Sequence, residues 1–588
     1  MNKASIEFRP IRDFVYPNSR TDLTILINAE TRDVKHIFLE YWTRKDLDRA
    51  HMQKKEMDRV YSDGLHDQFR TRIHLDPIAA YVRYRFEIHF SDETVTWLSS
   101  NGFESEDNPP DQSFYEFLWP NPSDCLDISD NNQSMIFYQI FPDRFRKSDA
   151  SLRKPEKLDT WGNLPTRLNY MGGDLPGIIE KLSYVKELGV NCIYINPIFE
   201  GVSNHKYDTR DYYRIDPAFG RNEDLKLLVN KAHELGIRVI LDGVFNHSGT
   251  QWKPFQDVLK FGNHSKYKDW FFIHRYPVTI DEQSYDCVGH YKWMPKINLA
   301  NPETQDYFID VGKYWIKEYS IDGWRLDVAD EIPTQFWERF SFEIKKEFPD
   351  SFLLGETWGD AHQLICGNRL DSAMNYVFRD AVVDWLAKGK ISAEEFNNRI
   401  NHMMMLYPFE KMSQMYNLLD SHDTPRFLFE CGGDVRKLKL AVALQMLFVG
   451  CPAVYYGDEI GMTGDNDPLC RGCMVWNHDE QNQDLLSWYQ KFIEVRKSYI
   501  ELERGDYRTL FADKDSIGFY RIYKDRSILV VINGGEEKKK LPVDLNQWEQ
   551  VLLENADQSS GEMPENNIEL QANSIGVWRM KEGVQYEF

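Results

Sequence analysis

Apolar residues follow two different patterns along the chain, and the change between them falls near residue 125. Before it, short apolar segments at 23–27, 36–41, 83–90 and 95–98 are separated by turn residues, which is typical of strands in a β-sandwich. Residues 121–134 are polar and rich in turn formers, so they predict a linker. We therefore expect an N-terminal β-sandwich over residues 1–125.

From about residue 135, continuous apolar runs alternate with stretches whose apolar residues recur every three or four positions. Continuous runs are typical of parallel strands covered on both faces, and the wider spacing, as in 175–188 and 302–319, is typical of helices. Eight strands alternating with helices predict an α/β fold, a (β/α)8 TIM barrel. The candidate strands are 135–141, 190–199, 237–245, 323–328, 352–357, 372–378, 415–419 and 453–456.

The predicted barrel, residues 126–505, is longer than the ~250 residues typical of this fold, so it carries insertions. The largest is an aromatic, irregular insertion over 246–298, after the third strand. A long loop at the carboxyl end of a barrel strand favours a functional role. Strand patterns return after residue 505 and predict a C-terminal β-sandwich over 506–588.

Composition and charge exclude some classes of function. The formal net charge of −23 disfavours nucleic-acid binding, because acidic surfaces repel phosphate. No signal-peptide core or membrane-spanning run is present, and the eight scattered cysteines fit a reduced, cytoplasmic protein. Aromatic residues make up 14% of the chain, a supply that suits sugar rings as well as cores.

Polar residues follow several of the predicted barrel strands, at the end where catalytic groups of this fold lie. Although they are far apart in sequence, the barrel would bring them around one mouth. They are Asp242, Asn246 and His247 after the third strand, Arg325 and Asp327 after the fourth, Glu356 after the fifth, and His422 and Asp423 after the seventh.

Two of these carboxylates have environments that predict opposite protonation states. Arg325 and Asp327 differ by two positions and share one side of a strand, so the arginine would keep Asp327 ionised. Glu356 follows an apolar run, which would raise its pKa and suit a general acid. Such a pair is typical of a glycosidase. A metal-dependent hydrolase is the alternative, but the chain lacks the His-x-His and HExxH patterns such sites use.

Four segments of the chain resemble the signature segments of the α-amylase family: DGVFNH (242–247), GWRLDVADE (323–331), GET (355–357) and SHD (421–423). MPKIN (294–298) and the N-terminal β domain resemble features of its neopullulanase, cyclomaltodextrinase and maltogenic amylase branch. The segments occur together and in order, and the resemblance covers essentially the whole chain.

The resemblance implies a retaining mechanism with Asp327 as nucleophile, Glu356 as acid/base and Asp423 as the third carboxylate. Retention predicts carboxyl oxygens of the first two about 5–5.5 Å apart. Transglycosylation would be a side activity. The resemblance also implies substrate-binding roles for His247, Arg325, His422, Tyr207, Asp242, Glu331, Trp358, Asp467 and Arg471.

Relatives often carry calcium after the first strand, which here would involve Asp149, Gly172 and Asp174. Lys147 stands where an oxygen ligand is expected and would replace the ion by pairing with Asp174. No cofactor is otherwise required. A second departure from the branch is Asp330, where relatives usually have asparagine.

The resemblance implies an enzyme that cleaves α-1,4-glucosidic bonds of cyclodextrins, maltodextrins and pullulan. It also implies a homodimer formed through the N-terminal domain. The alternatives are an α-1,6-cleaving or glucan-transferring relative, and a non-catalytic glucan-binding protein.

Overall fold

The computed structural model describes residues 1–46, 49–105, 113–126, 130–150, 158–367, 369–540, 545–555 and 569–583. Residues 127–129 of the predicted linker, Ser151 of the loop after the first barrel strand, and residues 541–544, 556–568 and 584–588 of the predicted C-terminal domain lie outside this description. Among the described residues, no helix is long and apolar enough to cross a membrane.

The N-terminal part of the chain forms two antiparallel sheets that enclose an apolar core, as the sequence predicts. Leu23, Ile25, Ile37, Leu39 and Phe86 are fully buried between the sheets. One sheet has the order β1 (Val15–Pro17), β2 (Asp22–Glu30), β6 (His66–His74), β5 (Asp58–Ser62). The other has the order β4 (Gln53–Glu56), β3 (Val34–Thr43), β7 (Val82–Phe90), β8 (Val95–Ser99), β9 (Gly102–Ser105), with β10 (Tyr115–Phe117) paired to β7.

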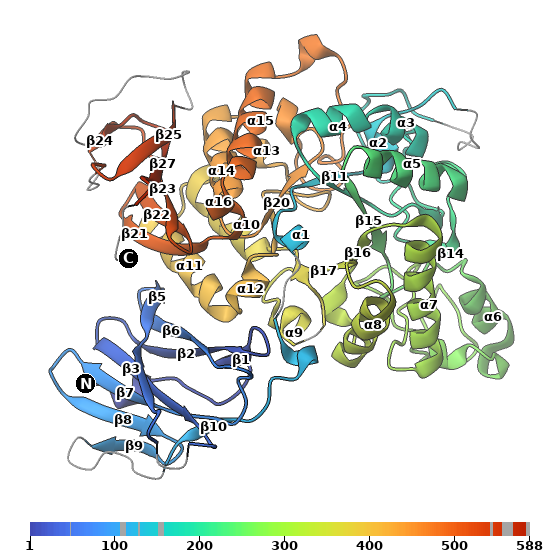
Figure 1. The fold of residues 1–588 in the computed structure, drawn as a ribbon. Coiled ribbons are helices and arrows are strands. Elements are labelled where there is room, and N and C mark those ends of the chain that lie inside the picture. Colours follow the sequence, from blue (N-terminus) through green and yellow to red (C-terminus); the bar gives the residue numbers. More distant parts are fainter. Residues whose placement is uncertain are drawn as a thin grey trace.

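The centre of the molecule is the predicted eight-stranded parallel barrel (Figure 1). Each of the eight apolar runs overlaps one of its strands, although β20 begins two residues before the predicted run 453–456. An isolated parallel bridge from Met374 to Tyr416 links the two ends of the sheet. The strand order is β18 (Ser372–Ala373), β17 (Phe352–Gly355), β16 (Gly323–Leu326), β15 (Arg238–Gly243), β12 (Cys192–Ile195), β11 (Phe137–Ile140), β20 (Cys451–Tyr455), β19 (Tyr416–Leu418).

Helices cover the outside of the barrel with apolar stripes. In α5 (Asn222–Glu234), for example, Leu225, Leu228, Val229 and Ala232 are buried, as their spacing predicts. The other long helices are α7 (Pro302–Tyr319), α8 (Thr334–Glu347), α11 (Ala393–Leu406), α14 (Val435–Leu447) and α15 (Gln483–Ser498). The shorter ones are α1 (Asp130–Gln133), α2 (Pro142–Phe145), α3 (Leu175–Glu180), α4 (Leu182–Leu188), α9 (His362–Ile365), α10 (Tyr376–Val382), α12 (Phe409–Met412), α13 (Phe427–Glu430) and α16 (Ile500–Arg504).

Three local predictions need correction. The sixth run, 372–378, is mostly not a strand, because the Asn375 side chain accepts a hydrogen bond from Phe378 N–H and starts α10 there. The stripe at 175–188 forms two helices, α3 and α4, which meet at the non-helical Lys181. The insertion at 246–298 is not wholly irregular, since it contains α6 (Lys253–Phe261), which begins with Pro254 in its first turn.

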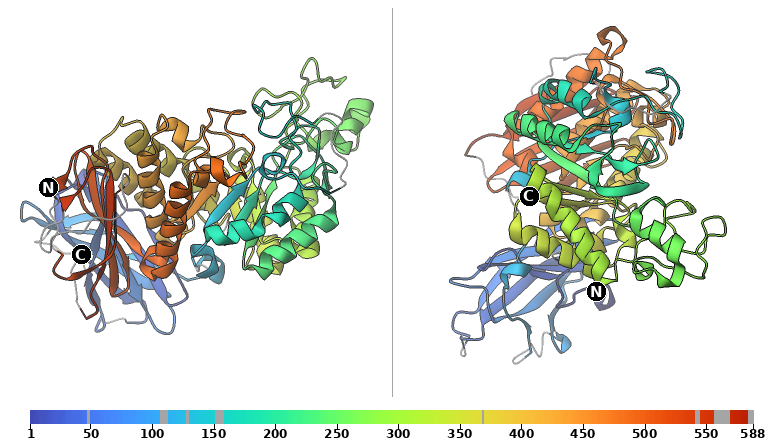
Figure 2. Two further views of the ribbon diagram at one scale, coloured as in Figure 1. Left: turned by 90° about the horizontal axis from the view of Figure 1, so that it is seen from above. Right: turned by 90° about the vertical axis from the view of Figure 1, so that its right-hand side faces the viewer.

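The C-terminal part of the chain forms an antiparallel sheet beside the barrel. Its order is β21 (Asp506–Ala512), β22 (Ser516–Tyr523), β23 (Arg526–Asn533), β27 (Ser574–Met580), β25 (Trp548–Asn555), and β24 (Lys539–Lys540) pairs separately with β26 (Glu569–Leu570). Figure 2 shows both sets of terminal strands at one end of the molecule and α6 at the other.

Candidate active site

A cavity of about 980 Å³ opens at the carboxyl ends of the barrel strands. Most of the residues that the sequence singled out line its wall. They are Tyr207, His247, Asp327, Glu356, Trp358, Asp423, Asp467 and Arg471. Asp242, Arg325 and His422 do not line it but are buried in direct contact with residues that do.

Arg325, on β16, joins three carboxylates at the floor of the cavity. Its Nη1 lies 2.7 Å from Oδ1 of Asp327 and 3.0 Å from Oδ1 of Asp242, while its Nη2 lies 2.8 Å from Oε2 of Glu356. The arginine side chain is completely buried, so water does not screen these contacts. One guanidinium thus fixes both members of the predicted catalytic pair in the same pocket.

The backbone between the two strands also positions Glu356. Val328, directly after Asp327, has a φ of 46°, which is rare for a β-branched residue. In this conformation its N–H donates a 2.9 Å hydrogen bond to Oε2 of Glu356. Local strain of this kind is typical of functional sites that the surrounding structure holds in place.

The expected contrast between Asp327 and Glu356 is not present in this geometry. Burial raises the pKa of Asp327 well above its ordinary value, and the Glu356 charge raises it further. Burial also raises the pKa of Glu356, against the opposing effect of Arg325. Glu356 does not sit among apolar groups alone, because it shares the arginine with Asp327. The two carboxyls therefore titrate as a pair with raised pKa values.

Asp423, Asp467 and Arg471 form an ion-pair chain along the wall of the same cavity. Arg471 Nη2 lies 3.1 Å from Asp423 Oδ1, and its Nη1 lies 3.0 Å from Asp467 Oδ1. Nε2 of His422 is 3.1 Å from the other oxygen of Asp423. The loop that carries Asp467 and Arg471 is thereby tied to the end of β19.

Tyr207 lies between the third and seventh strands in a hydrogen-bond network. It enters on a hairpin that the sequence did not predict, β13 (Phe199–Gly201) and β14 (Thr209–Ile215). Its ring stacks on His422 with centroids 5.6 Å apart and an interplanar angle of 9°. Its hydroxyl lies 2.6 Å from His422 Nε2 and donates to Asp242 Oδ2 at 3.0 Å.

Two residues of this network, Gln139 and Asn196, are not predicted from the sequence. Gln139 Nε2 donates to His422 Nδ1 at 2.8 Å, and Asn196 Nδ2 donates to the Tyr207 hydroxyl at 3.1 Å. Gln139 is buried on β11, and Asn196 directly follows β12. Both are polar residues at the ends of otherwise apolar strands, and this signal could have identified them. Together they set the orientation of the His422 ring.

His247 is buried, lines the cavity and presents unpaired nitrogens. Among the described residues, neither ring nitrogen has a hydrogen-bond partner, and Nε2 lies 4.0 Å from Asp327 Oδ2. Burial lowers its pKa to about 3. A neutral imidazole with free nitrogens is well suited to bind a sugar hydroxyl.

Three further residues stand near the outer part of the site. The Trp358 ring stacks on Tyr376 at 4.2 Å and is 53% exposed, so it presents a flat apolar face to the cavity. Glu331 does not line the cavity, and its carboxylate accepts from Lys296 at 2.7 Å and Asn246 at 3.0 Å. Asp330 lines the cavity and accepts a 3.0 Å hydrogen bond from the Thr357 hydroxyl.

The predicted calcium ligands do not fit an ion in this geometry. Asp174 is the N-cap of α3: its Oδ1 accepts from Gly177 N–H at 2.7 Å, and its Oδ2 accepts from the Ser148 hydroxyl at 2.9 Å. Asp149 and Lys147 are both exposed. Since the protein itself occupies the Asp174 carboxylate, we assign no step of the chemistry to calcium.

A barrel mouth that holds an acidic pair on one buried arginine, beside an exposed indole, defines a glycoside hydrolase. Comparison with known proteins specifies the family. The model "Alpha amylase, catalytic domain" matches residues 139–503, and "Alpha amylase, N-terminal ig-like domain" matches residues 1–120. The chain therefore belongs to the α-amylase family.

Individual relatives are similar over nearly the whole chain. It is 41% identical to a cyclomaltodextrinase of Geobacillus thermopakistaniensis (strain MAS1), covering 93% of both sequences. It is 38% identical to neopullulanase 2 of Thermoactinomyces vulgaris, covering 90% of both. A solved structure called cyclomaltodextrinase superposes with a TM-score of 0.91 at 36% identity, covering 98% of this chain and all of the other.

Proposed function

We propose that the protein hydrolyses α-1,4-glucosidic bonds of cyclodextrins, maltodextrins and pullulan and retains the α-configuration. The observation that carries the proposal is the placement of Asp327 and Glu356 on the single guanidinium of Arg325. The names of the similar cyclomaltodextrinase and neopullulanase support this choice of substrates.

In the proposed first step, the carboxylate of Asp327 attacks the anomeric carbon while protonated Glu356 gives its proton to the departing glycosidic oxygen. The bond from that carbon to the leaving sugar breaks, and a β-linked glycosyl ester forms on Asp327. The raised pKa of the buried pair supports a shared proton in the resting site, because two adjacent carboxylates do not both ionise readily.

In the second step, Glu356 takes a proton from water, and the hydroxide oxygen displaces Asp327 from the anomeric carbon. A sugar hydroxyl in place of water gives transglycosylation. We assign Asp423 to the hydroxyls of the distorted ring, with His247 and His422 on either side of it. The Asp467–Arg471 pair would bind the far end of the substrate, whereas Glu331 and Trp358 would shape the leaving-group side.

Product analysis tests the substrate and the chemistry together. Chromatography should find short maltooligosaccharides from β-cyclodextrin and starch, and from pullulan a trisaccharide that keeps its α-1,6 link. An Asp327→Asn variant should lose several orders of magnitude in rate. Cleavage confined to α-1,6 links would favour the debranching alternative. Binding without release of reducing sugar by the wild type would favour a glucan-binding protein.

We further propose a homodimer through the N-terminal domain and a cytoplasmic location. The dimer rests on the resemblance to the maltogenic amylase branch, and the location on the eight cysteines, none of which forms a disulfide in the described part of the chain. Sedimentation should give twice the chain mass. A monomer with full cyclodextrin activity would reject the dimer.

A further inference from the structure

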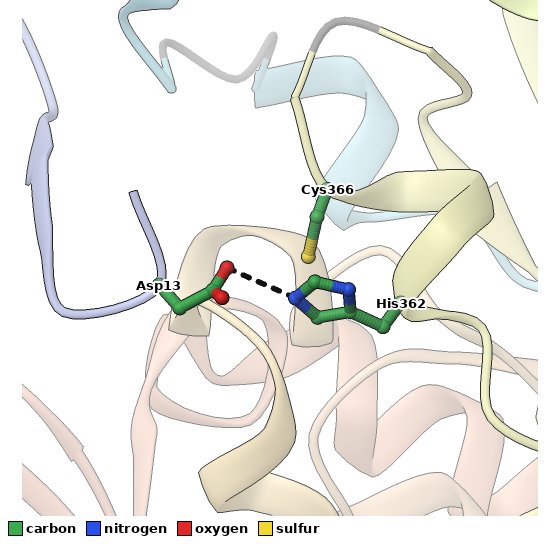
Figure 3. A group of neighbouring side chains, drawn as sticks. All are labelled: Asp13, His362 and Cys366. Carbon is green, nitrogen blue, oxygen red and sulfur yellow. Dashed lines mark hydrogen bonds and ion pairs between the residues drawn. The ribbon is translucent and has the colours of Figure 1, made fainter. Parts of the chain in front are cut away.

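Three side chains with metal-binding atoms meet where the N-terminal domain contacts the barrel. Asp13 lies in the turn before β1, whereas His362 begins α9 and Cys366 directly follows it. His362 and Cys366 are four positions apart, which places them on one side of this turn of helix. Figure 3 shows the thiol of Cys366 pointing toward the imidazole of His362 and the carboxylate of Asp13.

The donor atoms are close enough for one ion. One ligand atom from each residue lies within 4.8 Å of the other two, and His362 Nε2 is 2.9 Å from Asp13 Oδ1. Tetrahedral zinc with bonds of about 2.0–2.3 Å requires donors roughly 3.2–3.8 Å apart. Small rotations of these half-buried side chains would meet that requirement.

Other contacts hold the backbone of this group in place. The His362 N–H donates to Asp360 Oδ1 at 2.8 Å, and Asp360 also accepts from the Tyr407 hydroxyl at 2.8 Å. The Cys366 N–H donates to the His362 carbonyl oxygen at 3.0 Å. The three side chains also line a cavity of about 1010 Å³, which leaves room for a solvent ligand.

The mixture of donors selects the class of ion. A thiolate, an imidazole and a carboxylate together suit Zn²⁺ and related transition metals, whereas calcium and magnesium prefer oxygen ligands alone. Among the described residues, this is the single group of histidine, cysteine and acidic side chains with such spacing. It is separate from the cavity at the barrel mouth, because none of its members lines that cavity.

We propose that Asp13, His362 and Cys366 bind one ion of the Zn²⁺ class, with solvent as the fourth ligand. On binding, the Cys366 thiol releases its proton to solvent and the sulfur becomes the metal ligand. The ion replaces the direct contact between Asp13 and His362. It links the N-terminal domain to the segment that follows Glu356 and Trp358. This link helps to hold that segment in position.

Cobalt binding to the full-length protein tests the site without reference to activity. After treatment with a chelator and its removal, titration with Co²⁺ should give one ion per chain, with a thiolate-to-cobalt absorption band in the near ultraviolet. Cys366→Ser should abolish that band, and His362→Ala should abolish stoichiometric binding. Asp13→Asn, which lies outside the barrel, should weaken binding at least about tenfold.

Matched variants separate this site from adventitious binding. Cys287 is a partly exposed thiol elsewhere, and His74 is an exposed histidine that contacts Asp22. Cys287→Ser and His74→Ala should both bind Co²⁺ as the wild type does, and Zn²⁺ should displace the cobalt. A wild type without stoichiometric binding would overturn the proposal. So would an absorption band that persists in Cys366→Ser together with unchanged binding in His362→Ala.

Discussion

At the scale of single residues, Arg325 determines the electrostatics of the site. It contacts Asp327, Asp242 and Glu356, so each carboxylate affects the protonation of the other two. The arginine holds Asp327 and Glu356 in place, but its single positive charge is shared among three carboxyl groups. Burial in the same site keeps the His247 imidazole neutral, and within the described ranges neither of its nitrogens has a hydrogen-bond partner.

Trp358 should contribute to substrate binding more than to the chemical step. Its exposed ring offers a stacking surface but lies on the outer part of the cavity. For Trp358→Ala we expect KM for β-cyclodextrin to rise about tenfold, equivalent to loss of about 1.4 kcal/mol of stacking, with kcat changed far less. Steady-state kinetics test this, with Trp119→Ala as a control because Trp119 is 44% exposed and does not line the cavity. An unchanged KM would remove Trp358 from the binding surface.

His247 should make the protein less stable in mild acid. Burial lowers its pKa from 6.5 to about 3, so the unfolded chain takes up a proton near pH 6.5 while the folded protein does not. The free energy of unfolding is therefore highest above pH 6.5 and falls as the pH drops toward 3. At pH 5 this effect of His247 has lowered it by about 2 kcal/mol. Urea unfolding of His247→Asn should show a smaller fall between pH 7 and 5, whereas the exposed His264→Asn should follow the wild type. Equal falls in all three proteins would contradict the prediction.

At the scale of elements, the loops after the strands carry the site, and short helices fix their positions. Asp174 caps α3 with one oxygen and binds Ser148 with the other. Asp174→Ala should lower the free energy of unfolding by at least about 1 kcal/mol, whereas Asp174→Asn should lose less, because asparagine also caps helices. Urea unfolding with and without added Ca²⁺ measures both effects. Stabilisation of the wild type by Ca²⁺, with Asp174→Asn as unstable as Asp174→Ala, would instead indicate a calcium ligand.

The sequence predicts the barrel strands well because buried parallel strands are continuous apolar runs. It overestimates the sixth strand, since Asn375 starts a helix within an apolar stretch. The hairpin that carries Tyr207 escapes prediction because its burial pattern is irregular.

The placement of Asp327, Glu356 and Asp423 around one mouth follows from their positions at strand ends. The sharing of Arg325 between Asp327 and Glu356 depends on the contact between β16 and β17, which no local pattern encodes. The meeting of Asp13 with His362, 349 residues apart, is hidden for the same reason.

At the scale of the whole molecule, Asp506 fastens the N-terminal domain to the C-terminal sheet. Burial opposes its charge, but Arg508 and Arg70 outweigh burial and hold its pKa below the usual 3.8. The ionised Asp506 carboxylate therefore stabilises the folded protein fully above about pH 4, and this contribution is lost as the pH falls through the lowered pKa. Asp506→Asn should lower the free energy of unfolding by up to about 3 kcal/mol at pH 7, because it leaves two partly buried arginines without their carboxylate partner.

Urea unfolding at pH 7 and pH 3 measures this contribution, and the difference between Asp506→Asn and the wild type should shrink at the lower pH. The exposed Asp525→Asn in the same domain serves as the control. A variant as stable as the wild type at pH 7 would show that this contact does not join the domains.

The proposed mechanism requires a glycosyl ester on Asp327, and trapping this ester is the most direct test. A Glu356→Gln variant given α-maltosyl fluoride, whose leaving group needs no proton, should form the ester but hydrolyse it slowly. Mass spectrometry of the digested protein should then find a maltosyl adduct on the peptide that contains Asp327. No adduct, an adduct on another residue, or release of a β-configured product by the wild type would contradict the mechanism.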